Sequence, residues 1–361
     1  MVELSDEQRG VVEAIEEWLT TDRQVMAFGG YAGTGKTTVV SHLLRHHAAK
    51  VCAFTGKAAH VLRSKGVEGA STIHGLIYKA VTLCSLCEQK PQYCSCKTPV
   101  PRIVFKRRSF IDAKLIIVDE ASMISSFLRQ DLESYGVKVL YVGDHGQLGP
   151  IGNDVGVMAN PDVKLETIHR QAAGSPILQF AHHVREGHAP KAFGDEATII
   201  TEYPDKLADF DVAICGFNRT RNLLNFRIRR ELGFRERGPL VNERLVCLRN
   251  SRQHGVFNGM LATVLKVDRE EHTITVADES GRTYDALPFW GKQFGAPKTC
   301  KDVDGWITLW DYGYALTCHK TQGSQFDNVL VVDEQCDFWS PTRWLYTAAT
   351  RAAKRLTMKI D

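Results

Sequence analysis

The hydrophobic pattern of this chain alternates short apolar runs with longer amphipathic stretches. Mainly apolar runs of strand length occur at residues 25–28, 115–118 and 137–142 in the first half, and at 212–215 and 328–332 in the second. Runs of this kind are typical of parallel strands that helices cover on both faces. The pattern therefore predicts an α/β fold in which strands alternate with helices.

The first amphipathic stretch carries a helix-start signal. Ser5 is followed three positions later by Gln8, which is the spacing of a capping box. Val11, Ile15 and Leu19 then continue at helical spacing, so we expect a helix that begins at Ser5. Two roles are open for Gln8 at this point: its carboxamide can complete the cap, or it can recognise the edge of an adenine ring, because an amide both donates and accepts hydrogen bonds.

A phosphate-binding loop follows the first predicted strand. Residues 30–37 read Gly-Tyr-Ala-Gly-Thr-Gly-Lys-Thr and match the pattern G-x-x-x-x-G-K-[ST]. Backbone N–H groups of such a loop point at phosphate oxygens, Lys36 reaches the β and γ phosphates, and Thr37 is a ligand for Mg²⁺. A glycine-rich turn without a ligand is the alternative, which the strand–loop–helix context disfavours. The predicted nucleotide contacts are Gly30, Gly33, Thr34, Gly35, Lys36, Thr37 and Thr38.

Two further strands also end in polar residues. The run at 115–118 leads directly into Asp119 and Glu120, and the run at 137–142 leads to Gln147. The carboxyl ends of parallel strands form the edge of the sheet at which ligands bind. We expect Asp119 to hold Mg²⁺ and Glu120 to orient and deprotonate the water that attacks the γ-phosphate. Gln147 is expected to sense the γ-phosphate, with an ordinary loop amide as the alternative.

Composition narrows the class of protein. A chain of 361 residues with 43% hydrophobic residues is too long for one ordinary core and predicts two large domains. No apolar run is long enough to span a membrane, and the N-terminus has no basic segment followed by an apolar one, so we expect a cytoplasmic protein. The net charge of +3 is too small to indicate nucleic-acid binding, and the arginines concentrated at residues 219–237 fit either a DNA-binding surface or a solvated helix face.

The motifs above belong to a longer ordered series. In sequence order the segments are Gln8 and residues 30–37, 55–59, 71–74, 119–123, 143–148, 169–171, 319–324 and 350–351. With these segments in this order over nearly its whole length, the chain resembles the superfamily 1 helicases of the RecD-like and Dda-like branch. One departure is Gln325, which stands where many relatives have glutamate.

The resemblance implies two RecA-like domains that hydrolyse ATP with Mg²⁺ in the cleft between them while the protein moves 5′ to 3′ along single-stranded DNA. It implies that Gln8 recognises adenine and that Arg170 and Arg351 are arginine fingers, which stabilise charge on the γ-phosphoryl oxygens. The implied partners are single-stranded DNA and forked or tailed duplex DNA, bound largely through the backbone and therefore sensitive to salt. The implied strand contacts are Thr55, Lys57, Thr72, His74, His319, Lys320 and Gln322.

We place the first domain at residues 1–164 and the second at residues 165–361, each with an insertion. Residues 240–310 read as short alternating strands with turn signals, which predicts the small β-barrel that the resemblance implies; an irregular surface insertion is the alternative. Residues 76–112 occupy the place where these helicases carry a β-hairpin wedge that splits the duplex.

The hairpin insertion contains Cys84, Cys87, Cys94 and Cys96, four of the ten cysteines. Ten cysteines in a reducing compartment do not predict a disulfide framework, so a tight cluster points to a metal. Four thiolates this close in sequence can close a tetrahedral Zn²⁺ site, which is structural because no coordination position stays open. The final Cys-x-Cys is tighter than the commonest spacing, and four reduced, solvent-facing cysteines are the alternative.

The sequence therefore predicts an ATP-dependent DNA helicase. Two other classes are alternatives: a nucleic-acid-stimulated NTPase or translocase that remodels protein–DNA complexes without unwinding, and a DNA-binding zinc module on a catalytically silent phosphate-loop scaffold. The hairpin insertion argues against the first, and the intact Lys36, Glu120 and Arg351 argue against the second.

Overall fold

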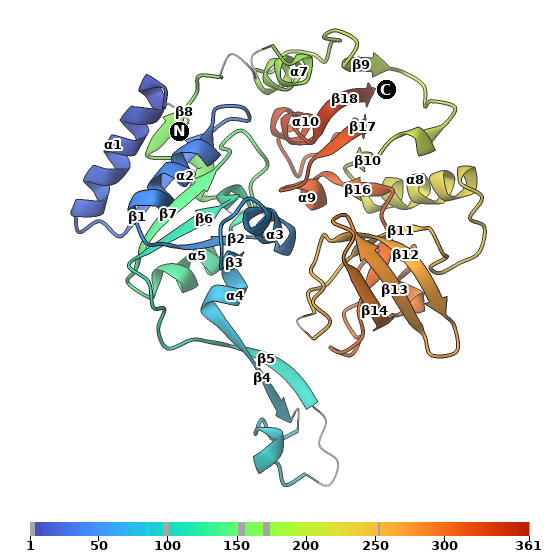
Figure 1. Cartoon of the computed structure of the whole chain (residues 1–361). Coiled ribbons are helices and arrows are strands. Elements are labelled where there is room, and N and C mark those ends of the chain that lie inside the picture. Colours follow the sequence, from blue (N-terminus) through green and yellow to red (C-terminus); the bar gives the residue numbers. More distant parts are fainter. Residues whose placement is uncertain are drawn as a thin grey trace.

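The computed structural model describes residues 4–84, 86–96, 101–150, 156–168, 174–251 and 253–360. Two lobes, each built on a parallel sheet with helices, lie side by side, and two antiparallel elements extend from them (Figure 1). The fold is therefore the α/β alternation that the hydrophobic pattern predicts. Among the described residues, no helix has the length and apolar character needed to cross a membrane.

The first lobe contains a parallel sheet with the strand order β3-β2-β6-β7-β1-β8. Its strands are β1 (Val25–Gly30), β2 (Lys50–Ala53), β3 (Ser71–Thr72), β6 (Leu115–Asp119), β7 (Lys138–Gly143) and β8 (Val163–Leu165). Its helices are α1 (Asp6–Thr20), α2 (Lys36–His46), α3 (Gly56–Ser64), α4 (Ile73–Ile77) and α5 (Ser126–Glu133), with the short 3₁₀ turns η2 (Ala121–Met123) and η3 (Val157–Ala159). The predicted capping box starts α1, because Ser5 and Gln8 each accept a hydrogen bond from the other's backbone N–H.

Helices cover both faces of this sheet. On β6, Ile117 packs in the cluster that contains Leu43 of α2, whereas the adjacent Ile116 packs in the cluster that contains Leu132 of α5. Successive side chains of a strand point to opposite faces. The strand is therefore apolar along its whole buried length, as its sequence predicts.

The second lobe contains a parallel sheet with the strand order β16-β10-β17-β18-β9. Its strands are β9 (Ala197–Ile200), β10 (Val212–Cys215), β16 (Ala315–Thr317), β17 (Phe326–Val332) and β18 (Ala352–Lys359). Its helices are α7 (Pro176–Arg185), α8 (Asn218–Glu231), α9 (Cys318–Thr321) and α10 (Pro341–Ala349), with the 3₁₀ turn η4 (Leu207–Asp209). The two apolar runs that the sequence identifies in this half form the neighbouring strands β10 and β17.

An antiparallel sheet is inserted in the second lobe between α8 and β16, with the strand order β14-β13-β12-β11-β15. Its elements are β11 (Arg244–Cys247), β12 (Leu261–Asp268), β13 (Thr273–Asp278), β14 (Thr283–Pro288), η5 (Gly291–Gln293) and β15 (Trp310–Tyr312). Gly259, shortly before β12, and Gly281, between β13 and β14, have positive φ angles of 85° and 84°, which glycine adopts without steric cost.

A two-stranded hairpin extends from the first lobe (Figure 1). It consists of β4 (Tyr78–Cys84) and β5 (Pro101–Arg107), and the 3₁₀ turn η1 (Pro91–Tyr93) lies in the segment between them. The ladder runs from the pair Tyr78–Arg107 to the pair Cys84–Pro101. The four clustered cysteines therefore lie at and beyond the far end of this ladder.

Candidate nucleotide-binding and DNA-binding site

The phosphate loop has the backbone geometry that its sequence predicts. Gly33 and Gly35 have φ angles of 81° and 83°, in the left-handed region that other residues rarely adopt. A Cβ atom on Gly30 would lie 2.8 Å from Thr34 Oγ1 and 2.9 Å from Lys36 Cγ, so the loop has no room for a side chain there. Lys36 Nζ donates to Gly30 O at 2.6 Å and to Tyr31 O at 2.9 Å, which holds the ammonium group against the loop.

Gln8 connects the first helix to this loop. Its side chain is buried, its Oε1 accepts from the Ser5 N–H at 3.1 Å, and its Nε2 donates to Thr34 O at 3.4 Å. The capping role is therefore confirmed. Recognition of adenine stays a prediction, and the contact with Thr34 places the amide beside the nucleotide-binding loop.

Two carboxyl groups lie at the end of β6. Asp119 Oδ1 accepts from the Glu120 N–H at 2.9 Å. Glu120 has a φ angle of 53°, a left-handed conformation that costs on the order of 1–3 kcal/mol outside glycine and is concentrated at functional sites. Burial raises the pKa of Asp119, and burial together with the charge of Asp119 raises the pKa of Glu120.

This donor set fits a magnesium ion. Mg²⁺ prefers oxygen ligands, which the Asp119 carboxylate and the Thr37 hydroxyl supply. The charge of Lys36 partly opposes the rise in the pKa of both acids, so the lysine lies near the two carboxyl groups. Buried carboxylates next to each other are stabilised by a cation between them and the phosphates.

The second lobe contributes Arg351 to the same space. Its guanidinium is buried and donates three hydrogen bonds, from Nε to Thr347 O at 3.1 Å, from Nη1 to Ser324 O at 3.3 Å and from Nη2 to Thr350 Oγ1 at 3.0 Å. Its charge lowers the pKa of Glu120. Arg351 therefore lies near Glu120 from the opposite lobe. The other predicted finger, Arg170, lies outside the described residues.

Tyr346 of α10, which the sequence does not single out, joins the lobes directly. Its hydroxyl donates to Asp144 Oδ2 at 2.8 Å and accepts from the Ala32 N–H of the phosphate loop at 2.8 Å. Asp144 also accepts from the Gly146 N–H at 2.9 Å and from Gln147 Nε2 at 3.3 Å. The phosphate loop, the Gln147 loop and α10 thus share one hydrogen-bonded chain. The available sequence signal was the position of Tyr346 one helical turn before Thr350.

Two more contacts tie the Gln147 loop to the second lobe. The Leu148 N–H donates to Thr347 Oγ1 at 2.9 Å, and the side chain of Gln322 donates to Leu148 O at 3.1 Å. Gln147 Oε1 is buried and has no hydrogen-bond partner among the described residues. An unpaired buried acceptor is costly, so this side chain is suited to receive a hydrogen bond from a bound molecule.

The predicted strand contacts of the first lobe lie on α3 and α4. Thr55 and Thr72 are the N-caps of these helices, and their hydroxyls accept from the Ala58 N–H at 3.1 Å and the Gly75 N–H at 3.0 Å. Lys57 Nζ is 3.0 Å from Glu279 Oε2 of the inserted sheet. His74 is exposed on α4 and packs beside the ring of Tyr78, with ring centroids 5.4 Å apart.

The predicted strand contacts of the second lobe lie on and directly after α9. Burial lowers the pKa of His319, and burial followed by the charge of Arg221 lowers the pKa of Lys320 to about 8. Gln322 is buried, and its hydrogen bond to Leu148 O gives it a role within the protein. A Cβ atom on Gly323 would lie 3.3 Å from the Cβ of Ala58, which shows that the turn after α9 lies against α3.

The arginine-rich segment is not one solvated or DNA-facing surface. Arg221 pairs with Asp311 at 3.0 Å, Arg229 pairs with Glu243, and all four side chains are buried. Both acids belong to or adjoin the inserted sheet. These two arginines therefore attach α8 to the inserted sheet.

Comparison with known families agrees with this geometry. Residues 3–201 match the family model described as an AAA domain, and residues 312–358 match the UvrD-like helicase C-terminal domain. The first match covers more than half of the chain. The chain belongs to the superfamily 1 helicases of the RecD-like branch. The family predicted from the motifs is confirmed.

Two relatives of this chain are longer proteins. The chain is 30% identical to the ATP-dependent RecD2 DNA helicase of Deinococcus radiodurans over 391 residues, which cover 98% of the chain and 48% of the relative. It is 24% identical to the conjugal transfer protein TraA of Agrobacterium fabrum over 371 residues, which cover 91% of the chain and 30% of that protein. The chain spans about half the length of the first relative and less of the second.

Solved structures share the fold over the whole chain. A structure of Pif1 helicases at forked double-stranded DNA aligns with a TM-score of 0.64 at 19% identity, covering 100% of this chain and 92% of that one. Bacteroides Pif1 bound to single-stranded DNA aligns with a TM-score of 0.62 at 18% identity, covering 100% of this chain and 93% of that one. The two lobes are therefore two RecA-like domains, as the resemblance implies.

Proposed function

We propose that this chain is an ATP-dependent DNA helicase that moves 5′ to 3′ on single-stranded DNA and separates forked or tailed duplexes. The observation that carries this proposal is the hydrogen bond between Tyr346 of α10 and Ala32 of the phosphate loop, which brings Arg351, just after that helix, to the lobe that holds Lys36 and Glu120. A nucleotide site completed by two lobes makes hydrolysis depend on their relative position. That dependence is what couples ATP turnover to movement along a strand.

In this proposal each group has a separate task. The phosphate loop and Lys36 bind the phosphates, Asp119 and Thr37 hold Mg²⁺, and the bound ion neutralises phosphate charge. Glu120 accepts the proton of the attacking water, and its raised pKa makes it a stronger base than an exposed glutamate. Arg351 stabilises the charge that develops in the transition state, with Arg170 as a second finger and Gln147 as the γ-phosphate sensor.

The proposed DNA path follows α3 and α4 of the first lobe and α9 of the second. Thr55, Lys57, Thr72, His74, His319 and Lys320 contact the strand backbone, whereas the buried Gln322 acts through its bond to Leu148. The hairpin of β4 and β5 is the element that meets the duplex.

The names of the relatives support these DNA partners. RecD2 is called an ATP-dependent DNA helicase, and the Pif1 structures are described with single-stranded and forked DNA. The proposed cofactors are ATP and Mg²⁺, with Zn²⁺ as a structural ion outside the nucleotide site.

The deciding experiment measures ATPase rates with and without single-stranded DNA. Lys36→Ala should abolish turnover, and Glu120→Gln should block hydrolysis while ATP stays bound, because it keeps the shape of the side chain and removes the base. Loss of one such group costs on the order of 3 kcal/mol, or at least about a hundredfold in rate. Glu68→Gln, at an exposed position of the same lobe, is the matched control.

Unwinding assays on duplexes with a 5′ or a 3′ tail complete the test. Unwinding from the 5′ tail alone is the expected result. Normal ATPase activity in both active-site variants would contradict the assignment of the site. ATPase activity without unwinding of either substrate would instead favour a translocase that remodels protein–DNA complexes.

A further inference from the structure

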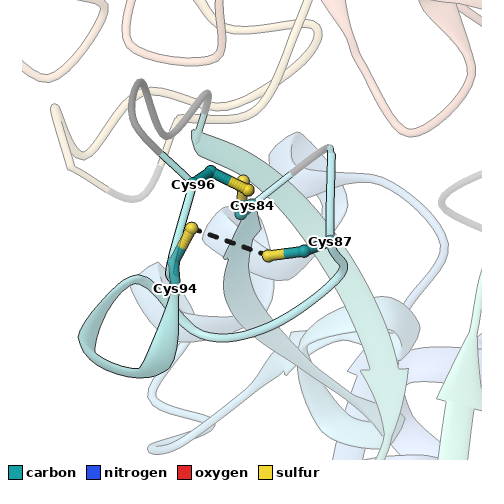
Figure 2. Close-up of side chains that lie close together, drawn as sticks. All are labelled: Cys84, Cys87, Cys94 and Cys96. Carbon is teal, nitrogen blue, oxygen red and sulfur yellow. Dashed lines mark hydrogen bonds between the residues drawn. The ribbon is translucent and has the colours of Figure 1, made fainter.

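The tip of the β4–β5 hairpin brings four cysteines together away from the nucleotide site. Figure 2 shows the sulfur atoms of Cys84, Cys87, Cys94 and Cys96 turned toward one another. All four Sγ atoms lie within 4.8 Å of one another, and the Sγ atoms of Cys87 and Cys94 are 3.5 Å apart. Cys84 is buried at the end of β4, whereas the other three are partly exposed on the loop that follows.

These separations fit a single tetrahedral metal ion. A zinc–sulfur bond of about 2.3 Å in tetrahedral geometry places neighbouring sulfur atoms about 3.8 Å apart. A disulfide requires a sulfur–sulfur bond of about 2.05 Å, much shorter than the separation of 3.5 Å between the Sγ atoms of Cys87 and Cys94. Iron–sulfur clusters insert several iron and sulfide atoms between the thiolates and need a wider arrangement. A mononuclear four-thiolate site is typical of Zn²⁺.

The backbone of the loop is already folded around the cysteines. The Cys84 N–H donates to Gln89 O at 2.7 Å, and the Glu88 N–H donates back to Cys84 O at 2.8 Å. This closed turn places Glu88 at a φ angle of 57°, a left-handed conformation that is unfavourable for glutamate. Metal binding at Cys84 and Cys87 would offset that cost, because both ligands flank the turn.

The tip lacks the apolar packing that would otherwise hold such a loop. Leu86 and Tyr93 are 66% and 67% exposed, and β4 and β5 pair with each other alone among the described strands. An isolated two-stranded hairpin is marginally stable in water, and small elements of this kind are commonly held by a metal or a disulfide.

One face of the hairpin, from its base to the cysteine loop, is lined by basic residues. Lys79 and Lys106 are exposed and directly opposite each other on the two strands, a like-charge pair that destabilises the ladder. They line one groove with Arg107, and Lys90 and Tyr93 from the cysteine loop complete it. The position of the cysteine loop therefore determines one wall of this groove. The basic residues of the groove suit the anionic backbone of a nucleic acid.

We propose that Cys84, Cys87, Cys94 and Cys96 bind one Zn²⁺ ion as four thiolates and that this ion fixes the cysteine loop against the basic face of the hairpin. The ion is structural, because four protein ligands leave no position for a substrate. Its presence does not depend on the proposed helicase activity, whereas its effect on forked DNA rests on that activity.

The first experiment determines the metal content of the full chain, purified with a thiol reductant and without chelator. One zinc ion per chain is expected in the wild type. The double variant Cys94→Ser/Cys96→Ser should lose it, while Cys300→Ser/Cys336→Ser, which changes two partly exposed cysteines outside the cluster, should keep it. Reconstitution with Co²⁺ should give the thiolate charge-transfer and tetrahedral d–d absorption of a four-sulfur site in the wild type and the control alone.

The second experiment measures fork unwinding and ATPase activity stimulated by single-stranded DNA. The Cys94/Cys96 variant should lose most fork unwinding and keep the stimulated ATPase activity, which also verifies that the lobes are folded. If that variant does not fold, mercurial release of zinc from the wild type provides the same comparison.

Wild-type protein without zinc, with iron in its place, or with disulfides among the four cysteines would overturn the metal assignment. Normal fork unwinding after zinc loss would overturn the role of the ion, and a chain that binds zinc but lacks ATPase activity would contradict the proposed function alone.

Discussion

Arg351 acts across the boundary between the lobes because its guanidinium is held by its own lobe. Three hydrogen bonds to Thr347, Ser324 and Thr350 fix its position, and its charge reaches Glu120. A preorganised cation of this kind stabilises charge that develops in a reaction without the cost of reorientation.

We therefore predict that Arg351→Ala lowers kcat far more than it lowers ATP affinity. A loss on the order of a hundredfold in kcat is expected, because the γ-phosphoryl charge that the arginine meets grows mainly in the transition state. Steady-state ATPase kinetics and equilibrium nucleotide binding measure the two quantities. Arg355→Ala, on the exposed side of β18, is the matched control, and a collapse of ATP affinity with kcat preserved would identify Arg351 as a ground-state ligand.

Lys320 predicts a pH dependence of DNA binding. Burial, with the nearby Arg221 charge, lowers its pKa from 10.5 to about 8. The lowered pKa means that the side chain is mostly charged at pH 7 and mostly neutral at pH 9, whereas an ordinary lysine stays charged at both. Affinity for single-stranded DNA should therefore fall as the pH rises through about 8, and the salt dependence of binding should become weaker.

Lys320→Arg should remove this step, because arginine stays charged over the whole range. Fluorescence anisotropy with mixed-sequence DNA between pH 7 and pH 9 provides the measurement. A pH profile that is the same in wild type and Lys320→Arg would contradict contact between Lys320 and the strand.

Helix α10 connects the nucleotide loop of one lobe to the body of the other. The Tyr346 hydroxyl forms hydrogen bonds with both Ala32 and Asp144. Thr347, the next residue of the helix, accepts a hydrogen bond from the Leu148 N–H. Since Asp144 also accepts a hydrogen bond from Gln147, a shift of α10 would move the phosphate loop together with Gln147, the proposed γ-phosphate sensor.

We predict that Tyr346→Phe weakens the coupling between DNA binding and hydrolysis. The substitution keeps the ring and removes the hydroxyl, which leaves the Asp144 carboxylate one donor short and the Ala32 N–H unpaired at a cost of about 1–3 kcal/mol. The ratio of ATPase rates with and without single-stranded DNA should fall about tenfold, with ATP affinity little changed. Tyr203→Phe, in the second lobe and outside the proposed nucleotide and DNA sites, is the control, and an unchanged ratio would leave Tyr346 a packing residue.

In the whole molecule, the inserted sheet lies against α3, the helix of the first lobe that we propose binds DNA. Lys57 of α3 pairs with Glu279, whose side chain is 56% exposed, and a Cβ atom on Gly56 would lie 2.5 Å from the Cβ of Phe257. An ion pair this exposed contributes at most about 1 kcal/mol, so a DNA phosphate can replace Glu279.

We predict opposite effects for the two partners of this ion pair. Lys57→Ala should weaken binding of single-stranded DNA and reduce the slope of log affinity against log salt by about 1, because one phosphate contact is lost. Glu279→Gln should strengthen binding, because it removes the competing carboxylate. Titrations at several salt concentrations test both, and an unchanged slope in Lys57→Ala would exclude that phosphate contact.

The sequence by itself determined the features that depend on neighbouring residues. Apolar runs predicted β1, β6, β7, β10 and β17, the Ser5–Gln8 spacing predicted the cap of α1, and the phosphate-loop pattern predicted the strand–loop–helix turn. Each is a local arrangement, in which hydrophobic periodicity or backbone sterics act over a few positions.

Only the tertiary structure decided which distant residues meet. It buried Arg221 and Arg229 in ion pairs with Asp311 and Glu243, although their sequence context also fits a DNA-binding surface. It joined Tyr346 to Asp144, which are 202 positions apart in the chain. It also buried Gln322 against Leu148. Composition and spacing along the chain do not predict such contacts, because burial and pairing depend on how the two lobes and the inserted sheet pack against one another.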